Sequence, residues 1–189
     1  MKLVVGLGNP EAERYYNRHN IGHLYIHLVE QKYFPDEAPI IEPNIVRYYI
    51  ADENTPNAII YAMPMTGMND SGLAVKFLME KYNIQPSDTL IILDEIDLPF
   101  GRVRLRLKGK THHNGLKSII EQTGIADIPR LRVGVGEKPL NIDTISYVLS
   151  DFTEEEKTEL DETILSIIDL SVFVWIHRPP EIAMTTINK

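Results

Sequence analysis

Short apolar runs, rich in β-branched residues, alternate along this chain with longer amphipathic segments. The strand-like runs are residues 2–7, 46–50, 58–63, 89–93, 102–107 and 131–135. The helix-like segments are residues 20–33, 69–82, 115–122 and 153–176. Because interleaved strands and helices pack as a sheet between helical layers, the pattern predicts an α/β fold: a mixed, twisted β-sheet flanked by helices on both faces.

No internal repeat or linker divides the 189 residues, so we expect a single domain over residues 1–189. Residues 35–43 are rich in proline and acidic side chains, and we expect them to form a surface loop. Thr153 and Glu156 form a capping box that starts the last predicted helix, and Pro179-Pro180 stops it.

The chain contains no cysteine, which excludes disulfides, thiolate metal sites and a cysteine nucleophile. Its first residues run directly into a predicted strand and lack the pattern of a signal peptide. The longest apolar run, residues 170–176, is too short to span a bilayer. We therefore expect a cytoplasmic protein with no membrane association.

The net charge of -8 is unevenly distributed along the chain. Residues 102–132 contain eight basic and two acidic residues, a local charge of +6, whereas residues 150–189 carry -6. A local basic patch can bind phosphate in an acidic protein, because salt confines the relevant field to about 10 Å. The residues expected to contact phosphate are Arg102, Arg104, Arg106, Lys108, Lys110 and Arg132. The alternative is that the alternating arginines form only the solvated face of a strand.

Residues 6–10, Gly-Leu-Gly-Asn-Pro, follow the first predicted strand. They resemble the start of a dinucleotide-binding fingerprint, but the third glycine of that fingerprint would fall at Glu11. A tight turn is one interpretation. The functional interpretation is that Asn9 presents a polar side chain at the carboxyl end of a strand, where open α/β sheets place their sites.

Three histidines, His19, His23 and His27, are spaced to lie on one helical face. This spacing is compatible with a metal site, but the HExxH glutamate and cysteine are both absent. We therefore predict no metal, with packing or solvated roles for His23 and His27. A lone histidine such as His19 is more often structural than catalytic, so its role needs further evidence.

Three polar residues occur where predicted elements end or begin. Asp94 ends a buried strand, where a carboxylate can orient an imidazole or simply stabilise a turn. Asn69 and Asn114 stand at helix starts, where an asparagine can be only an N-cap.

Taken in order, these pieces resemble the bacterial peptidyl-tRNA hydrolase family. The matching strings are residues 5–10, 18–22, 64–72, 94–99, 113–116 and 130–136. The resemblance covers essentially the whole chain and implies one α/β domain of the phosphorylase/hydrolase-like type. It also implies a monomer, no metal, no organic cofactor, and peptidyl-tRNA as the partner. The chain departs from the family at Glu11 and in the glycine-poor loop 108–112.

The resemblance also implies roles for individual residues. His19 matches the catalytic histidine, and Asp94 matches the carboxylate that orients it. Asn9, Asn69 and Asn114 match asparagines that line the ester and peptide site, and Arg106 and Arg132 match basic positions around tRNA phosphate. The remaining residues assigned to substrate binding are His113 and Tyr15. Arg14 stands where the family usually has a tyrosine, and Tyr15 is adjacent to it.

The chemistry expected of these residues is ester hydrolysis. With no cysteine and no Gly-x-Ser-x-Gly string, direct attack by water is the simplest route. Neutral His19 would deprotonate the water, and the Asn69 amide would donate to the oxyanion. Two alternatives remain at this point: a non-catalytic RNA-binding relative of the family, and a hydrolase of small esters or nucleotides.

Overall fold

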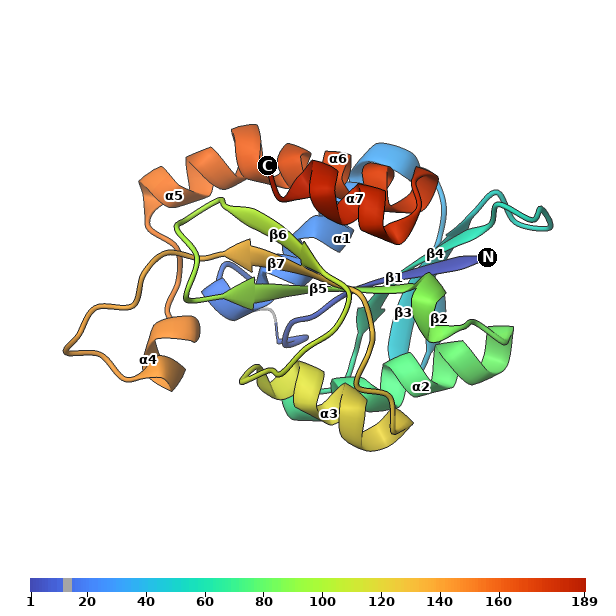
Figure 1. The fold of residues 1–189 in the computed structure, drawn as a ribbon, viewed down its shortest axis with the longest axis horizontal. Coiled ribbons are helices and arrows are strands. Elements are labelled where there is room, and N and C mark those ends of the chain that lie inside the picture. The colour runs from blue at the N-terminus through green and yellow to red at the C-terminus, as the bar shows by residue number, and fades with distance from the viewer. Residues whose placement is uncertain (12–14) are drawn as a thin grey trace.

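The computed structural model describes residues 1–11 and 15–189, so Arg14, at the position of the family tyrosine, lies outside the described residues. Within these residues, seven strands form one sheet in the order β2-β3-β4-β1-β5-β7-β6 (Figure 1). The strands are β1 (Lys2–Gly6), β2 (Ile40–Glu42), β3 (Val46–Ala51), β4 (Ile59–Pro64), β5 (Thr89–Glu95), β6 (Val103–Arg106) and β7 (Arg130–Gly134). The central strands β4, β1, β5 and β7 are parallel, and β2, β3 and β6 pair antiparallel at the edges. The predicted mixed sheet is confirmed.

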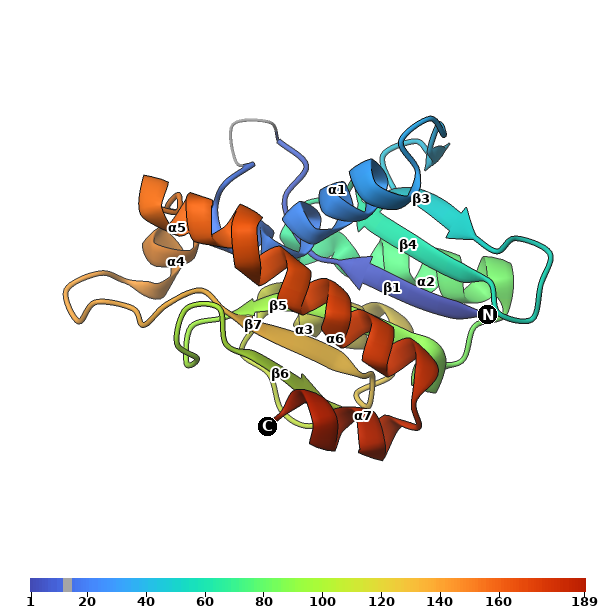
Figure 2. The same cartoon turned by 90° about the horizontal axis from the view of Figure 1, so that it is seen from above.

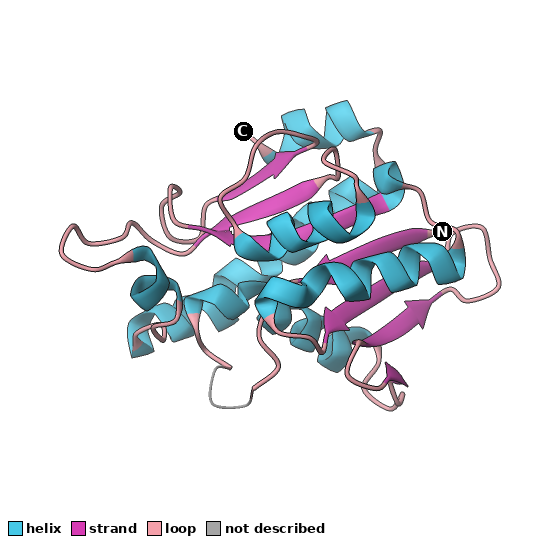
Figure 3. Ribbon diagram, turned by 90° about the horizontal axis from the view of Figure 1, so that it is seen from below, coloured by secondary structure: helices cyan, strands magenta, loops and turns pink. Residues whose placement is uncertain are grey.

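Helices cover both faces of this sheet, as predicted. One face carries α1 (Ile21–Tyr33), α6 (Leu165–His177) and α7 (Pro180–Ile187), which Figure 2 shows from above. The other face carries α2 (Ser71–Tyr82) and α3 (Asn114–Thr123), seen from below in Figure 3. None of the helices in the described residues is long and apolar enough to cross a membrane.

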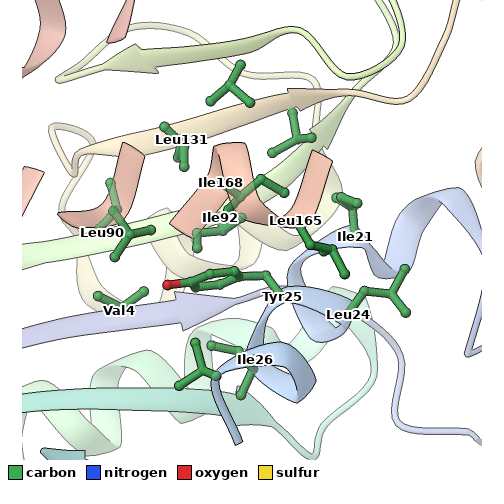
Figure 4. Packing of buried hydrophobic residues seen from close by; sticks show 14 of the residues in the cluster. Val4, Ile21, Leu24, Tyr25, Ile26, Leu90, Ile92, Leu131, Leu165 and Ile168 are labelled. Carbon is green, nitrogen blue, oxygen red and sulfur yellow. The ribbon is translucent and has the colours of Figure 1, made fainter. Parts of the chain in front are cut away.

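The core consists of two apolar clusters, one on each side of the sheet. Val4 belongs to the cluster under α1 and α6, whereas its neighbours Leu3 and Val5 belong to the cluster under α2. Figure 4 shows the first cluster, in which Tyr25 of α1 and Ile168 of α6 pack over the sheet. Since successive strand residues point to opposite faces, a strand covered on both sides must be apolar throughout, which explains the unbroken run at residues 2–7.

Two glycines allow the first strand and the residues after it to approach α1 closely. A Cβ on Gly6 would lie 2.1 Å from the carbonyl oxygen of Gly22, and one on Gly8 would lie 2.4 Å from the ring of His23. The fingerprint-like glycines are therefore explained by this close approach of helix and strand. The approach also fixes the turn before α1, which carries His19.

The C-terminal segment differs from the single predicted helix. Thr153 and Glu156 form the predicted capping box at the start of α5 (Glu154–Glu159). A π-helical segment, Leu160–Ile164, then joins α5 to α6. Local π-helical bulges interrupt otherwise continuous α-helices without changing the apolar pattern, so periodicity does not reveal them. The predicted stop at Pro179-Pro180 is confirmed, because α6 ends at His177. Pro180 then occupies the first turn of α7, a helix that was not predicted.

Two further short elements were not predicted. The surface-loop prediction for residues 35–43 is partly wrong, because Ile40–Glu42 form edge strand β2 against β3. The helix α4 (Thr144–Val148) was missed; its N-cap Asp143 accepts from the Ser146 backbone N–H. Three or five residues are too few to display a hydrophobic period, so only the surrounding structure defines these elements.

Candidate active site

His19, Asp94 and His113 meet at the carboxyl end of the sheet. His19 lies in the 3-10 turn Arg18–Asn20 before α1, Asp94 near the end of β5, and His113 at the N-cap of α3. One carboxylate oxygen, Asp94 Oδ1, lies 2.7 Å from His19 Nδ1 and 2.8 Å from His113 Nε2. The two imidazole centroids are 4.8 Å apart. Strand, turn and helix start thus place three groups from distant parts of the chain in contact.

Asp94 is ionised in this arrangement. Its side chain is buried, and burial alone would raise its pKa, but the charges and hydrogen bonds of His113 and His19 hold the pKa well below its usual range. An ionised carboxylate accepts hydrogen bonds only, so both facing ring nitrogens carry protons. Asp94 therefore fixes the tautomers of His19 and His113.

The tautomers distinguish the two histidines. Because His19 donates through Nδ1, its Nε2 carries the lone pair when the ring is neutral. His113 donates through Nε2, and its Nδ1 is buried with no hydrogen-bond partner in the described part of the chain. His19 lines the cavity described below, so its Nε2 is the ring nitrogen placed to accept a proton. A base at His113 Nδ1 would have no access to solvent.

Arg18 anchors the turn that carries His19, a role that the sequence did not indicate. Its Nη1 donates to the Val135 carbonyl oxygen at 2.7 Å, and Nη2 contacts Glu156 Oε2 at 2.7 Å. The guanidinium also lies 4.8 and 5.0 Å from the ring centroids of Tyr147 and Phe152. Residues of the β7 end, α4 and α5 therefore hold the turn in place. Sequence patterns could not reveal these contacts, since each joins distant segments.

Asn9 links the first strand to the turn before α2. Its Oδ1 accepts from the Met68 backbone N–H at 2.9 Å, which directs its Nδ2 donors elsewhere. The backbone of Asn9 is held by the Asn20 side chain, through N–H to Oδ1 at 2.8 Å and Nδ2 to carbonyl oxygen at 3.2 Å. Asn9 is thus a fixed amide beside the His19 turn.

Asn69 and Asn114 are exposed, and neither acts as a helix cap. The residues at the N-caps are Asp70 for α2 and His113 for α3, without side-chain capping bonds. Asn114 lines the same cavity as His19, and Asn69 follows Met68, which packs against Gly115 at the start of α3. The N-cap alternative is therefore wrong for both asparagines, and their exposed amides remain available for a ligand.

A cavity of about 610 Å³ opens beside the two histidines. The lining residues include His19, Asp94, His113 and Asn114 at one side and the basic residues Arg106, Lys110, Arg130 and Arg132. Glu95, Asp97, Thr111, His112 and, from α4, Thr144, Ile145 and Val148 also contribute. The contribution of α4 was not predicted, because the sequence pattern did not indicate the helix itself.

The predicted phosphate-binding residues separate into two groups. Arg106, Lys110 and Arg132 line the cavity, but Arg102, Arg104 and Lys108 do not. Arg102 donates to the carbonyl oxygen of Lys189, and Arg104 donates to that of Val103. Arg132 is paired with Glu95 through Nε at 2.7 Å.

Tyr15 is not among the cavity-lining residues. Its ring lies 4.8 Å from that of Tyr16 and 5.0 Å from that of His27. Tyr15 therefore packs against His27 of α1, and its role in substrate binding stays a prediction.

The possible metal ligands differ from those considered in the sequence. The three histidines His19, His23 and His27 have separate partners. His19 contacts Asp94, burial lowers the pKa of His23 to about 3, and His27 pairs with Glu30. Among the described residues, the one cluster with metal-ligand spacing is His19, Asp94 and His113, whose ligand atoms lie within 4.8 Å. In that cluster His19 Nδ1 and His113 Nε2 each donate a hydrogen bond to Asp94, and these two bonds account for the short contacts.

An α/β sheet that presents a carboxylate-bound histidine in a cation-lined cavity is the arrangement expected of a hydrolase whose substrate carries phosphate. The peptidyl-tRNA hydrolase family model matches residues 3–189. The chain therefore belongs to the peptidyl-tRNA hydrolase family.

Individual relatives agree with this assignment. The chain is 38% identical to a peptidyl-tRNA hydrolase of Aquifex aeolicus, covering 100% of this chain and 97% of the relative. It is 34% identical to that of Thermotoga petrophila, covering 98% and 96%. A solved peptidyl-tRNA hydrolase of Acinetobacter baumannii superposes with a TM-score of 0.81 at 30% identity, covering 100% of this chain and 94% of the other. These findings confirm the predicted family and its hydrolase activity, and they do not favour the non-catalytic RNA-binding alternative.

Proposed function

We propose that this protein hydrolyses the ester between peptide and tRNA with a water molecule that His19 Nε2 deprotonates. The observation that carries the proposal is the 2.7 Å contact between His19 Nδ1 and the ionised Asp94, which leaves Nε2 as the proton acceptor beside the cavity. Deprotonation of water by a positioned imidazole is general base catalysis, and the carboxylate stabilises the imidazolium that forms.

The proposed reaction proceeds in two proton transfers. His19 takes a proton from water, and the resulting hydroxide attacks the ester carbonyl carbon to form a tetrahedral intermediate. The bond to the ribose oxygen then breaks, and the imidazolium returns its proton to that oxygen. The products are a peptide with a free carboxylate, its own proton passing to solvent, and a tRNA with a free ribose hydroxyl.

The asparagines have positioning roles in this proposal. The exposed amide of Asn69 donates to the oxyanion of the intermediate, a contribution typically worth about 3 kcal/mol. Asn9 directs its Nδ2 toward the peptide or the water, because its Oδ1 already accepts from Met68. Asn114 contacts substrate from the start of α3, within the cavity that holds His19.

Phosphate contacts, which supply affinity without reading base sequence, suit an enzyme that accepts many tRNAs. The predicted residues that support this role are Arg106, Lys110 and Arg132, because all three line the cavity. One copy of the chain carries every proposed site residue, so we propose a monomer acting as one domain. Peptidyl-tRNA arises where ribosomes work, which supports a cytoplasmic setting.

The test is hydrolysis of an N-blocked aminoacyl-tRNA by the purified protein with a chelator present. We expect turnover by the unaltered protein, and loss of turnover with retained tRNA binding in His19→Ala. The matched control is His177→Ala, an exposed histidine at the end of α6 outside the cavity, which should turn over normally. Normal turnover in His19→Ala would reject the assigned base.

A further inference from the structure

Arg130 is a buried arginine with no hydrogen-bond partner among the described residues. Its residue is 3% exposed, and Nε, Nη1 and Nη2 all lack a hydrogen-bond partner within residues 1–11 and 15–189. The side chain lines the cavity that also holds His19 and Asp94. Buried guanidinium groups are normally paired, because an uncompensated charge in the interior is strongly destabilising. Arg130 is therefore a candidate to bind an anion that enters the cavity.

The neighbours of Arg130 increase this cost. Burial lowers its pKa, and repulsion from Arg106 and Arg132 acts in the same direction, with Asp127 as the opposing charge. Arg132, two residues along the same strand, is neutralised by Glu95. Arg132 therefore has a structural ion pair, whereas Arg130 has no carboxylate partner among the described residues and can bind an anion.

Strand pairing places a second cation beside Arg130. Arg106 of β6 lies directly opposite Arg130 of β7 in the antiparallel register, so both side chains leave the same face of the sheet. Arg106 is exposed and lines the same cavity. Guanidinium groups bind phosphate through paired N–H donors, so two arginines on neighbouring strands of one cavity wall suit a phosphate ligand.

The same register relates this pair to the histidines. Asp94 pairs with Val133, three residues beyond Arg130 on β7. At about 3.3 Å per strand residue, Arg130 lies roughly 10 Å from the level of Asp94 along the sheet. An RNA strand that places its terminal ester at His19 thus brings a nucleotide close to that terminus within reach of Arg130.

We propose that Arg130, together with Arg106, binds an internal backbone phosphate of the RNA strand whose terminal ribose carries the ester. This inference rests on the proposed function and adds a residue and a ligand group to it. The strand that carries the ester must enter this cavity, whereas a phosphate at the other end of the RNA need not. Arg132, held by Glu95, contributes less than Arg130.

The first test crosses two substrates with three variants. The substrates are an N-blocked aminoacyl ester of adenosine, which has no phosphate, and the same ester on a trinucleotide without a terminal phosphate. We expect Arg130→Met to lower kcat/KM about 10- to 100-fold on the trinucleotide, the range for hydrogen bonds to charged groups, and less than about 3-fold on adenosine. Arg132→Met should lose less, and Arg178→Met, which removes an exposed arginine outside the cavity, should match the unaltered protein.

Equal losses on both substrates would overturn the proposal, since the residue would then act on no phosphate of the trinucleotide. A loss seen only on full-length tRNA bearing a 5′-phosphate would also overturn it, by assigning Arg130 to that terminal group. Arg130→Lys, which keeps the charge, should recover part of the trinucleotide rate.

The second test does not depend on catalysis. Binding of the deacylated trinucleotide, measured by calorimetry, should weaken about 10-fold or more in Arg130→Met while adenosine binding is unchanged. The melting temperature of Arg130→Met should be equal or higher, because the variant removes a buried charge that lacks a partner. A lowered melting temperature with unchanged trinucleotide binding would make Arg130 structural. If the unaltered protein hydrolyses neither these esters nor N-blocked aminoacyl-tRNA, the proposed function fails, and the binding result alone decides the role of Arg130.

Discussion

Replacing Asp94 with asparagine tests the arrangement on which the proposed catalysis depends. The substitution keeps the shape of the side chain and removes its charge from a position 2.7 Å from His19 Nδ1. An asparagine amide can also turn its NH₂ group toward His19, which would place the proton on Nε2 and remove the base. We therefore expect Asp94→Asn to lower kcat while tRNA binding persists.

The magnitude follows from the geometry. For unit charges 2.7 Å apart and an effective dielectric constant of about 20, the attraction between carboxylate and imidazolium is roughly 6 kcal/mol, or about four powers of ten in rate. The asparagine oxygen retains part of this attraction, so we expect kcat to fall by about 10³ to 10⁴, similar to a buried triad aspartate. His113→Ala should cost less, because it leaves the bond between His19 and Asp94 in place.

The assay is single-turnover hydrolysis of N-blocked aminoacyl-tRNA, with tRNA binding and the melting temperature measured on the same preparations. These two controls separate lost chemistry from lost substrate or lost fold. If Asp94→Asn stays within 10-fold of the unaltered protein, the carboxylate does not stabilise an imidazolium. A fall of His113→Ala below Asp94→Asn would assign the base to His113 instead.

Three further predictions concern stability and charge. Burial lowers the pKa of His23 from 6.5 to about 3, so between these pH values the unfolded state binds a proton that the native state does not. The free energy of unfolding is therefore unaffected by His23 above pH 6.5 and declines by up to about 1.4 kcal/mol per pH unit as the pH falls toward 3. Melting curves at pH 7 and 4.5 should show less acid sensitivity in His23→Gln, and equal sensitivity would contradict this. Gly6→Ala should destabilise the protein by about 3 kcal/mol or more, because the new Cβ meets the Gly22 carbonyl oxygen. The melting temperature should fall by roughly 6–12 °C, and an unchanged melting temperature would show that helix and strand separate freely. Glu95→Gln should free Arg132, tightening RNA binding and steepening its log–log salt slope by about 0.7; an unchanged slope would show that Arg132 reaches no phosphate.

Much of the fold could be predicted from local patterns. Each of these patterns can be recognised within a few consecutive residues. Examples are the apolar run at residues 2–7, which indicates burial on both faces, the alternation at residues 102–107, which indicates one solvated face, and the capping box at Thr153. These patterns define the central strands and long helices, and their order defines the α/β class. The ordered polar motifs likewise predicted the family. Short elements such as α4 and β2 escaped, because their stability comes from neighbours distant in the chain.

Only the tertiary structure decided how the predicted side chains are used. The sequence marked His19, Asp94 and His113 separately, but the parallel register and the close contact of β1 with α1 bring both imidazoles to one carboxylate oxygen. The same applies to charge: Arg130 and Arg132 are indistinguishable as letters in a basic segment, yet Glu95 pairs with one and leaves the other bare. Local periodicity records which face a residue occupies, whereas the partner it meets depends on how distant strands and helices pack.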